Sequence, residues 1–291
     1  MELLKENISQ FRTPAIRDLV WVLCSPCPLN EVSGLPLFTD AAKLKWYTSH
    51  FSLLEAWDKA PETFLKHLND FTKNHRLGYY FEALMHTFFH LSPSIEVVIA
   101  NHQIIRDKQT LGEIDFILQE GEEIYHLELA IKYYLQFQNE DDFSTWLGPN
   151  GKDSLSKKIK KLKSHQLQLT KHLEAYQNIA SRALICGQFY QNNQRVVWQN
   201  TNALLKPYMK QSDFIKGDFD AHVEAYYLLT KPHWLSATVV PDESLRLDGK
   251  DELVEKMKES FAQKKAVHVG LLYAKGYTSI VLVPDAWPTL P

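Results

Sequence analysis

The pattern of apolar and polar residues is clearest between residues 74 and 192. Apolar residues recur at helical spacing from His75 to His90, which predicts an amphipathic helix. Runs rich in β-branched and aromatic residues predict four strands: Ile95–Ile105, Ile114–Leu118, Ile124–Tyr134 and Arg182–Tyr190. A turn over Asp107–Gly112 and a tight turn at Gly121 join the first three strands, so we expect a meander.

A second helix is predicted between the third and fourth strands. Asp153 or Ser154 can cap its first turn. Its apolar face would be formed by Leu155, Ile159, Leu162, Leu169 and Leu173. The predicted order is helix, three strands, helix, strand, which indicates an α/β protein with a mixed central sheet flanked by helices.

The flanking regions have weaker patterns. Prolines break the apolar stretches of residues 1–73, which predicts an irregular helical extension. Further elements are predicted over Val196–Trp198, over Ala225–Leu229, and as a hairpin over Val267–Leu272 and Ser279–Val283. We therefore divide the chain into an N-terminal extension (1–73), a core (74–192) and a C-terminal appendage (193–291), which extends the core sheet or forms a small lobe.

Composition limits the classes of function. The 291 residues are 45% hydrophobic, enough for a sizeable core, and the net charge is −3. The molecule has no bulk attraction for nucleic acid, so such a contact would need a local basic patch. No apolar run is long enough to cross a bilayer, and three cysteines cannot form a disulfide framework. We expect a cytoplasmic protein without membrane contact, and a homodimer stays open.

Two carboxylates lie on neighbouring predicted strands. Asp115 ends a Gly-Glu-Ile-Asp segment on the second strand, and Glu128 lies in the third strand. Strand side chains alternate, so His126, Glu128, Ala130 and Lys132 share one face. Converging carboxylates are the oxygen ligands that Mg²⁺ or Mn²⁺ prefers. A nearby lysine can orient water and offset negative charge.

These residues resemble the motif of the PD-(D/E)XK nuclease superfamily. That motif has one carboxylate, followed on the next strand by (D/E)xK, and Asp115 and Glu128 match its acidic positions. The resemblance implies a restriction-endonuclease-like αβββαβ core, with Glu82 of the first helix assisting the metal site. The sequence departs at Ala130, which occupies the place of the motif lysine. Lys132 lies two residues further on, about 6–7 Å along the strand.

A basic segment follows the site strands. Lys157, Lys158, Lys161 and Gln166 belong to a cluster that could position a nucleic-acid backbone, because phosphate contacts need charge more than exact geometry. The alternative is an ordinary solvated helix face.

Several segments together resemble a bacterial family called domain of unknown function 1853. They are RLGYYFE, GEIDF, HLELAIKYYL, WLGPN with the following HQLQL, KPHWL and VPDAWP, and they span nearly the whole chain. The family is placed by similarity in the PD-(D/E)XK superfamily and has no established activity to carry over. It implies the fold and a candidate site of Glu82, Asp115, Glu128 and Lys132, with the displaced lysine as part of its pattern.

Two functions remain after this comparison. The first is a Mg²⁺- or Mn²⁺-dependent nuclease that hydrolyses DNA or RNA, with Asp115 and Glu128 as metal ligands and Lys132 as the displaced catalytic lysine. The second is a catalytically inactive relative that binds nucleic acid or a protein partner, and Ala130 keeps it open. A zinc peptidase is disfavoured, since His86 and His90 form HxxxH with Thr87 where the catalytic glutamate would stand.

Overall fold

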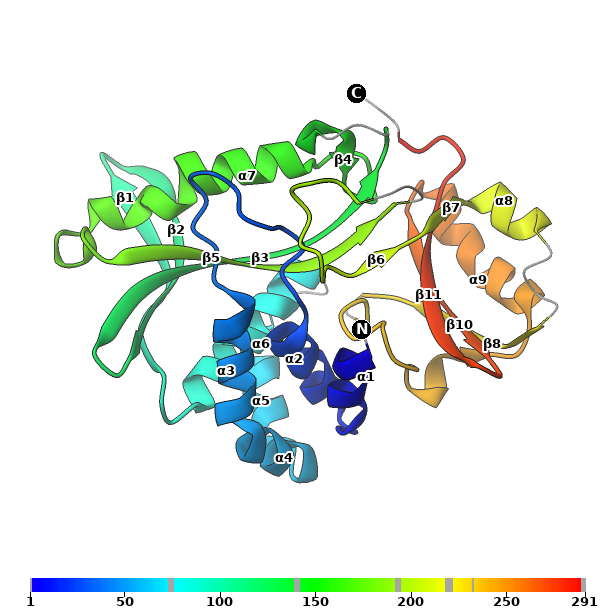
Figure 1. Ribbon diagram of the computed structural model, residues 1–291, viewed down its shortest axis with the longest axis horizontal. Helices are drawn as coiled ribbons and strands as arrows, with labels where there is room; N and C mark the ends of the chain where they lie inside the picture. The colour runs from blue at the N-terminus through cyan, green and yellow to red at the C-terminus, as the bar shows by residue number, and fades with distance from the viewer. Residues whose placement is uncertain are drawn as a thin grey trace.

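The computed structural model describes residues 2–72, 76–138, 142–191, 195–217, 222–231 and 233–288. Within these residues the protein is a mixed α/β structure with two mixed sheets, which lie one after the other along the long axis (Figure 1). The boundaries predicted at 73/74 and 192/193 fall outside the described residues. No helix in the described ranges has the length and apolar character needed to span a membrane.

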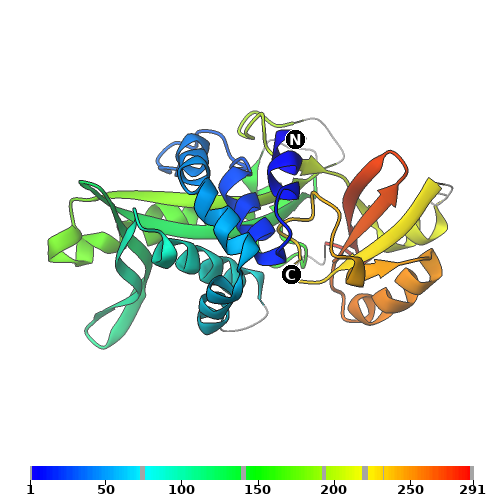
Figure 2. The same ribbon diagram turned by 90° about the horizontal axis from the view of Figure 1, so that it is seen from below.

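Helices cover one face of the larger sheet (Figures 1 and 2). They are α1 (Glu2–Ser9), α2 (Pro14–Cys24), α3 (Asp40–Ser49), α4 (Phe51–Lys59), α5 (Glu62–Phe71) and α6 (Leu77–Leu91). The predicted helix over residues 75–90 is confirmed as α6, except for His75, which lies outside the described residues. The largest apolar cluster joins α2 and α6 to the sheet, through residues such as Trp21, Phe81 and Leu127. Burial of these apolar side chains fixes α6 against β3.

The larger sheet contains the four predicted strands. Its strands are β1 (Glu96–Arg106), β2 (Gln109–Glu120), β3 (Glu123–Gln136), β4 (Trp146–Leu147), β5 (Ala180–Tyr190) and β6 (Leu205–Lys206). The order is β1-β2-β3-β5-β6, with β4 paired to β3. β1, β2 and β3 form the predicted antiparallel meander, and β5 runs parallel to β3.

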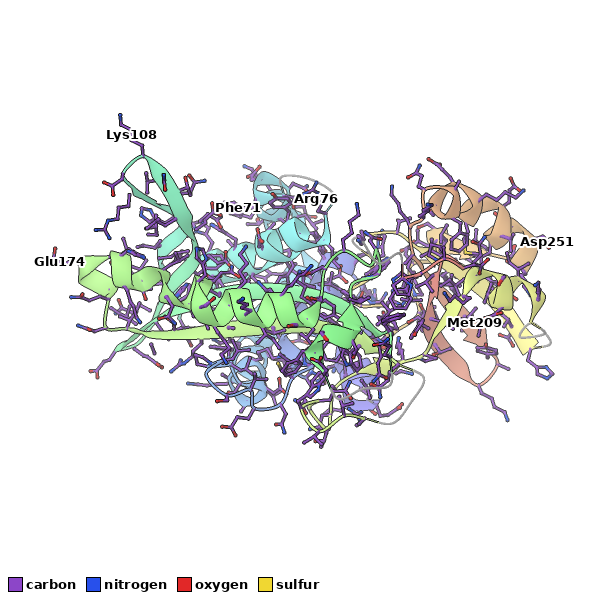
Figure 3. All side chains as sticks on the ribbon, turned by 90° about the horizontal axis from the view of Figure 1, so that it is seen from above. Phe71, Arg76, Lys108, Glu174, Met209 and Asp251 are labelled. Carbon is purple, nitrogen blue, oxygen red and sulfur yellow. The ribbon has the colours of Figure 1, made fainter. Side chains whose placement is uncertain are left out.

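The turn between β1 and β2 is shorter than predicted. It uses only Asp107 and Lys108, whose φ angles of 50° and 63° are typical of a tight hairpin turn, so β2 already begins at Gln109. Gln109, Thr110 and Gly112 pair with β1, with a register shift at Leu111, so the hairpin extends beyond the part of β2 that pairs with β3. Figure 3 shows Lys108 at the tip of this hairpin, at the same end of the molecule as Glu174 and at the opposite end from Asp251.

Helix α7 (Leu155–Ser164) covers the opposite face of the sheet (Figure 1). The Ser154 hydroxyl accepts a hydrogen bond from the Lys157 N–H, which confirms the predicted cap. The prediction of one helix through Leu173 is wrong: the chain leaves α-helical geometry at His165 and continues as the 3-10 helices η2 (Gln166–His172) and η3 (Glu174–Tyr176). His165 Nε2 donates to the Leu111 carbonyl at 2.7 Å, so the interruption docks this segment on β2.

The C-terminal region forms a separate sheet. Its strands are β7 (Tyr208–Lys210), β8 (Val223–Leu229), β9 (Arg246–Leu247), β10 (Val267–Tyr273) and β11 (Gly276–Val283), in the order β7-β11-β10-β8-β9. It packs with α8 (Gln211–Lys216) and α9 (Lys250–Ala262). The predicted hairpin is confirmed as β10–β11. Val196–Trp198 forms a turn rather than a strand, and the short 3-10 helices η1 (Phe143–Thr145) and η5 (Glu243–Leu245) complete the assignment.

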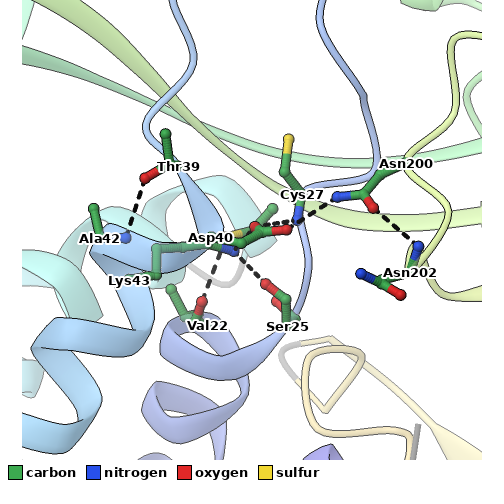
Figure 4. Close-up of polar contacts among 10 residues, drawn as sticks. Val22, Ser25, Cys27, Thr39, Asp40, Ala42, Lys43, Asn200 and Asn202 are labelled. Carbon is green, nitrogen blue, oxygen red and sulfur yellow. Dashed lines mark hydrogen bonds and ion pairs between the residues drawn. The ribbon is translucent and has the colours of Figure 1, made fainter.

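Asp40 anchors the long connection between α2 and α3 (Figure 4). Its carboxylate accepts hydrogen bonds from the Cys27 N–H at 2.7 Å and from Asn200 Nδ2 at 3.0 Å. The buried Lys43 amine lies 3.2 Å from the same carboxylate and also donates to the Ser25 carbonyl. The pairing of the buried Lys43 amine with Asp40 holds the α2–α3 connection in place. Residues of this connection line a cavity of about 590 Å³.

Candidate functional site

The candidate site lies where β2 separates from β3. The two strands pair as far as Phe116 and Leu127, and Asp115 and Glu128 are the next residues beyond that pair. Further along, β2 continues to pair with β1 while β3 pairs with β5. The separation leaves ladder groups of β3 without a β2 partner. The Leu129 N–H therefore donates to Asp115 Oδ2 at 2.7 Å, which fixes this carboxylate at the fork.

Gly112 allows η2 to lie directly against the Asp115 strand. A Cβ atom at this position would lie 2.9 Å from Leu169 Cδ1 and 3.0 Å from His165 Cε1. Glycine at the start of the Gly-Glu-Ile-Asp segment thus serves close packing of the helical segment on β2.

Glu128 is held in place from two directions. Its side chain is 0% exposed. His126 Nε2 donates to Oε1 at 3.0 Å, and Gln166 Nε2 donates to Oε2 at 2.7 Å. His126 Nδ1 lies 3.1 Å from the Ser181 hydroxyl, so the imidazole is itself oriented. Each carboxylate oxygen has more than one lone-pair direction, and these bonds leave acceptor capacity for a cation or water.

The negative charges of the site oppose each other. Burial raises the pKa of Asp115 well above its ordinary value, and the charges of Glu128 and Glu82 raise it further. The Leu129 N–H and the positive charge of Lys158 lower the pKa of Asp115. Carboxylates that repel each other at a partly buried position favour a proton or a cation between them.

The structure brings Glu82 of α6 to the same region. After burial and the charge of Glu128, the negative charge of Glu82 also raises the pKa of Asp115. Glu82 also lines a cavity of about 90 Å³ together with Asp70, Phe71, Tyr79, Ala83, His86 and Asn101. The cavity lies between the helices and the β1–β2 hairpin. Glu82 therefore lies near enough to Asp115 for its charge to act on that carboxylate.

The Lys132 amine pairs with Asp153 rather than with either of these carboxylates. The amine lies 2.5 Å from Asp153 Oδ2, on the segment before α7. The Tyr134 hydroxyl donates to the same oxygen at 3.2 Å. Asp153 thus directs the predicted catalytic amine toward the start of α7. The sequence does not reveal this partner, because its local pattern identifies Asp153 only as a possible helix cap.

The predicted nucleic-acid-binding residues divide into two groups. Lys157 and Lys161 are exposed on α7. Lys158 is partly buried, and its amine donates to Gln166 Oε1 at 3.0 Å. Because Gln166 Nε2 donates to Glu128, Lys158 and Gln166 belong to the carboxylate site. Burial lowers the pKa of Lys158, the charge of Lys132 lowers it further, and Glu128 and Asp115 raise it.

His126 and Ser181 were not predicted as site residues. His126 shares the strand face of Glu128, and two-residue alternation was the signal that could have identified it. Ser181 lies opposite His126 in the parallel pair of β3 and β5, which only the strand register reveals.

A family profile described as Domain of unknown function (DUF1853) matches residues 17–277. The chain belongs to this family. The match includes every candidate residue from Glu82 to Gln166 and extends through most of the C-terminal sheet, so the site lies inside the DUF1853 domain. Comparisons with curated proteins and with solved structures gave no match.

Proposed function

We propose that this DUF1853 protein is a metal-dependent phosphodiesterase that cleaves nucleic acid. The observation that supports this most is the placement of Asp115 and Glu128 at the fork of β2 and β3, where burial and then the charge of Glu128 raise the pKa of Asp115. A divalent cation would relieve that repulsion and would provide the charge that a phosphodiester needs.

We further propose that the core belongs to the restriction-endonuclease-like folds of the PD-(D/E)XK superfamily. The order α6, β1, β2, β3, α7 and β5 supports this assignment. The antiparallel meander followed by the parallel β3–β5 pair supports it as well. Fold alone does not define activity, so the functional proposal rests on the acidic residues.

The donor set fits Mg²⁺ or Mn²⁺ better than zinc. The described residues include no group of three or more His, Cys, Asp or Glu side chains placed to enclose one metal ion. Mg²⁺ commonly takes one or two carboxylates and completes its shell with water and substrate phosphate. Asp115 and Glu128 would be the direct ligands, and Glu82 would assist. A bound divalent ion would polarise the phosphodiester and lower the pKa of the attacking water.

The protein groups around the carboxylates have defined tasks in this proposal. His126 and Gln166 orient Glu128, and the Leu129 N–H orients Asp115. The exposed Lys157 and Lys161 would contact the phosphates of a DNA or RNA backbone.

The second candidate is a relative that binds nucleic acid without cleaving it. The observation that favours it is the pairing of the Lys132 amine with Asp153, because this amine is then not directed at the carboxylates. The two candidates differ in one measurable outcome, which is cleavage in the presence of a divalent cation.

The test incubates the pure protein with single-stranded, duplex and branched DNA and with RNA, with Mg²⁺ or Mn²⁺. We expect cleavage by the wild type and a loss of at least about 100-fold in Asp115→Ala, since one metal ligand is removed. Glu113→Ala is the matched control, because Glu113 is an exposed carboxylate two residues away on β2. This control should cleave like the wild type.

Cleavage that survives Asp115→Ala would come from a contaminant and would refute the nuclease proposal. Binding of the polymers by the wild type without cleavage under any of these conditions would establish the second candidate.

A further inference from the structure

The two lysines of the site differ in what their amines face. The Lys132 ammonium is paired with Asp153 at 2.5 Å. In addition, Lys132 lies four residues beyond Glu128 on β3, about 13 Å along an extended strand. Its side chain is directed to the segment before α7. A different residue can therefore provide the positively charged amine beside the carboxylates.

Lys158 reaches the carboxylates from α7. Its neighbours Lys157, Lys160 and Lys161 are exposed, whereas Lys158 is partly buried. Its amine donates to Gln166 Oε1 at 3.0 Å, and Gln166 Nε2 donates to Glu128 Oε2 at 2.7 Å. The amide oxygen takes the ammonium and the amide nitrogen serves the carboxylate, so Gln166 links the two charges in one orientation.

The charge effects support the same placement. Burial lowers the pKa of Lys158, the charge of Lys132 lowers it further, and the negative charges of Glu128 and Asp115 raise it. Both lysines therefore lie near the carboxylates, but of the two only Lys158 is linked to Glu128 through Gln166. Asp115 and Glu128 would hold the metal ion there, and the Lys158 amine would supply a positive charge to a bound phosphate.

We propose that Lys158, and not Lys132, is the catalytic amine of this site, where its ammonium contacts the non-bridging oxygens of the scissile phosphodiester. This inference rests on the proposed function. In the reaction, a water oxygen bonds to phosphorus and the bond from phosphorus to the leaving oxygen breaks. A proton lost by the water passes through solvent, and the leaving oxygen gains one. Lys158 keeps its proton and stabilises the negative charge that develops at phosphorus.

The test compares Lys158→Met, Lys158→Arg and Lys132→Met in the full chain, with Lys160→Met as the matched control on the same helix, because Lys160 is exposed and has no assigned role. We expect Lys158→Met to lower kcat by about 100-fold or more while KM changes little, because the amine acts on the transition state. Lys158→Arg retains the charge and should recover part of this loss. Lys132→Met and Lys160→Met should remain close to the wild type. Thermal unfolding of each variant checks that the fold is retained.

Two outcomes would overturn the assignment. One is a wild-type kcat in Lys158→Met when Asp115→Ala is inactive, which refutes the role of Lys158 and leaves the proposed function intact. The other is a large loss in Lys132→Met with none in Lys158→Met.

A second measurement needs no cleavage. Acetic anhydride labels lysine amines at rates that mass spectrometry resolves residue by residue. We expect Asp115→Asn, and Mg²⁺ added to the wild type, to change the labelling rate of Lys158 and to leave that of Lys157 unchanged. If the wild type cleaves nothing, the proposed function fails, and an unchanged Lys158 rate would refute its placement at the carboxylates as well.

Discussion

The backbone N–H of Leu129 donates a hydrogen bond to Asp115 Oδ2 at 2.7 Å, across the fork where β2 leaves β3. The bond does two things at once. It satisfies a strand N–H that has lost its ladder partner, and it holds the carboxylate at the fork, where the charge of Glu128 acts on it. The fork thus explains why an acidic residue is stable at this position in spite of burial and like charge. The same relationship makes the stability of the protein depend on the protonation of Asp115.

Asp115→Asn should stabilise the protein at alkaline and neutral pH. The amide oxygen can still accept the Leu129 N–H, while the repulsion from Glu128 and Glu82 is removed. We expect a gain on the order of 1 kcal/mol, or about 2–4 °C in Tm. The folded-state pKa of Asp115 is raised, so the folded protein binds a proton before the unfolded chain does. The advantage of the variant therefore shrinks as pH falls through that raised pKa toward the ordinary value of 3.8.

Urea denaturation of wild type and Asp115→Asn at several pH values measures this difference. Glu113→Gln, the exposed neighbour, should show no comparable gain. Mg²⁺ should stabilise the wild type and have little effect on Asp115→Asn, because a ligand stabilises only the state that binds it. A variant that is less stable than the wild type at pH 8 would contradict this account of the site.

Lys206→Met should stabilise the protein at neutral pH. Lys206 is 8% exposed, and its amine donates to the Ala237 carbonyl and the Ser279 hydroxyl rather than to a carboxylate. Burial lowers the pKa of Lys206 to about 7, with a further contribution from the charge of Lys5. Between about pH 7 and 10.5 the unfolded chain binds a proton that the folded protein lacks, so stability rises with pH across this window.

Methionine has a similar length without the ionisable group, and Ser279 still donates to the Ala237 carbonyl in its absence. We expect Lys206→Met to be more stable than the wild type by on the order of 2 kcal/mol at pH 7, with a flatter dependence between pH 7 and 10. Denaturation curves across this range provide the measurement, with the exposed Lys45→Met as control. An unchanged pH slope would show that the buried amine does not titrate in this range.

The sequence predicted the regular elements of the core better than their ends. Apolar periodicity identified α6, the meander and β5 because these elements bury one face or both. It missed the break at His165, since Leu169 and Leu173 continue the helical spacing although the segment turns onto the β1–β2 hairpin. That break depends on a contact with Leu111, more than fifty residues away in the chain.

In the candidate site, too, local features were predictable from the sequence and features that depend on tertiary contacts were not. Asp115 and Glu128 were identifiable because motif spacing and strand alternation act locally. The direction of a long lysine side chain is not a local property. Asp153 attracts Lys132, and Gln166 attracts Lys158, only because the segment before α7 and η2 fold over β3. The sequence therefore identified the carboxylates and left the choice between the two amines to tertiary structure.

Gly187 lies on β5, at a position where the backbone of the neighbouring strand β3 leaves no room for a side chain. It pairs with Lys132 in the parallel β3–β5 ladder, and its φ of 146° is one that L-residues rarely adopt. A Cβ atom there would lie 1.7 Å from the Lys132 carbonyl oxygen. Relief of that clash requires β3 and β5 to move apart.

We therefore expect Gly187→Ala to cost at least about 3 kcal/mol, a large share of the stability of a typical domain. Gly78→Ala is the matched control: Gly78 lies inside α6, and a Cβ there meets no atom within 4 Å. Alanine at position 78 should stabilise the protein by about 0.5–1 kcal/mol, because it restricts the unfolded chain and favours the helix. The same Gly→Ala change is therefore expected to lower the free energy of unfolding at position 187 and to raise it at position 78. Equal effects in urea denaturation would show that the close approach of β3 and β5 does not determine the cost.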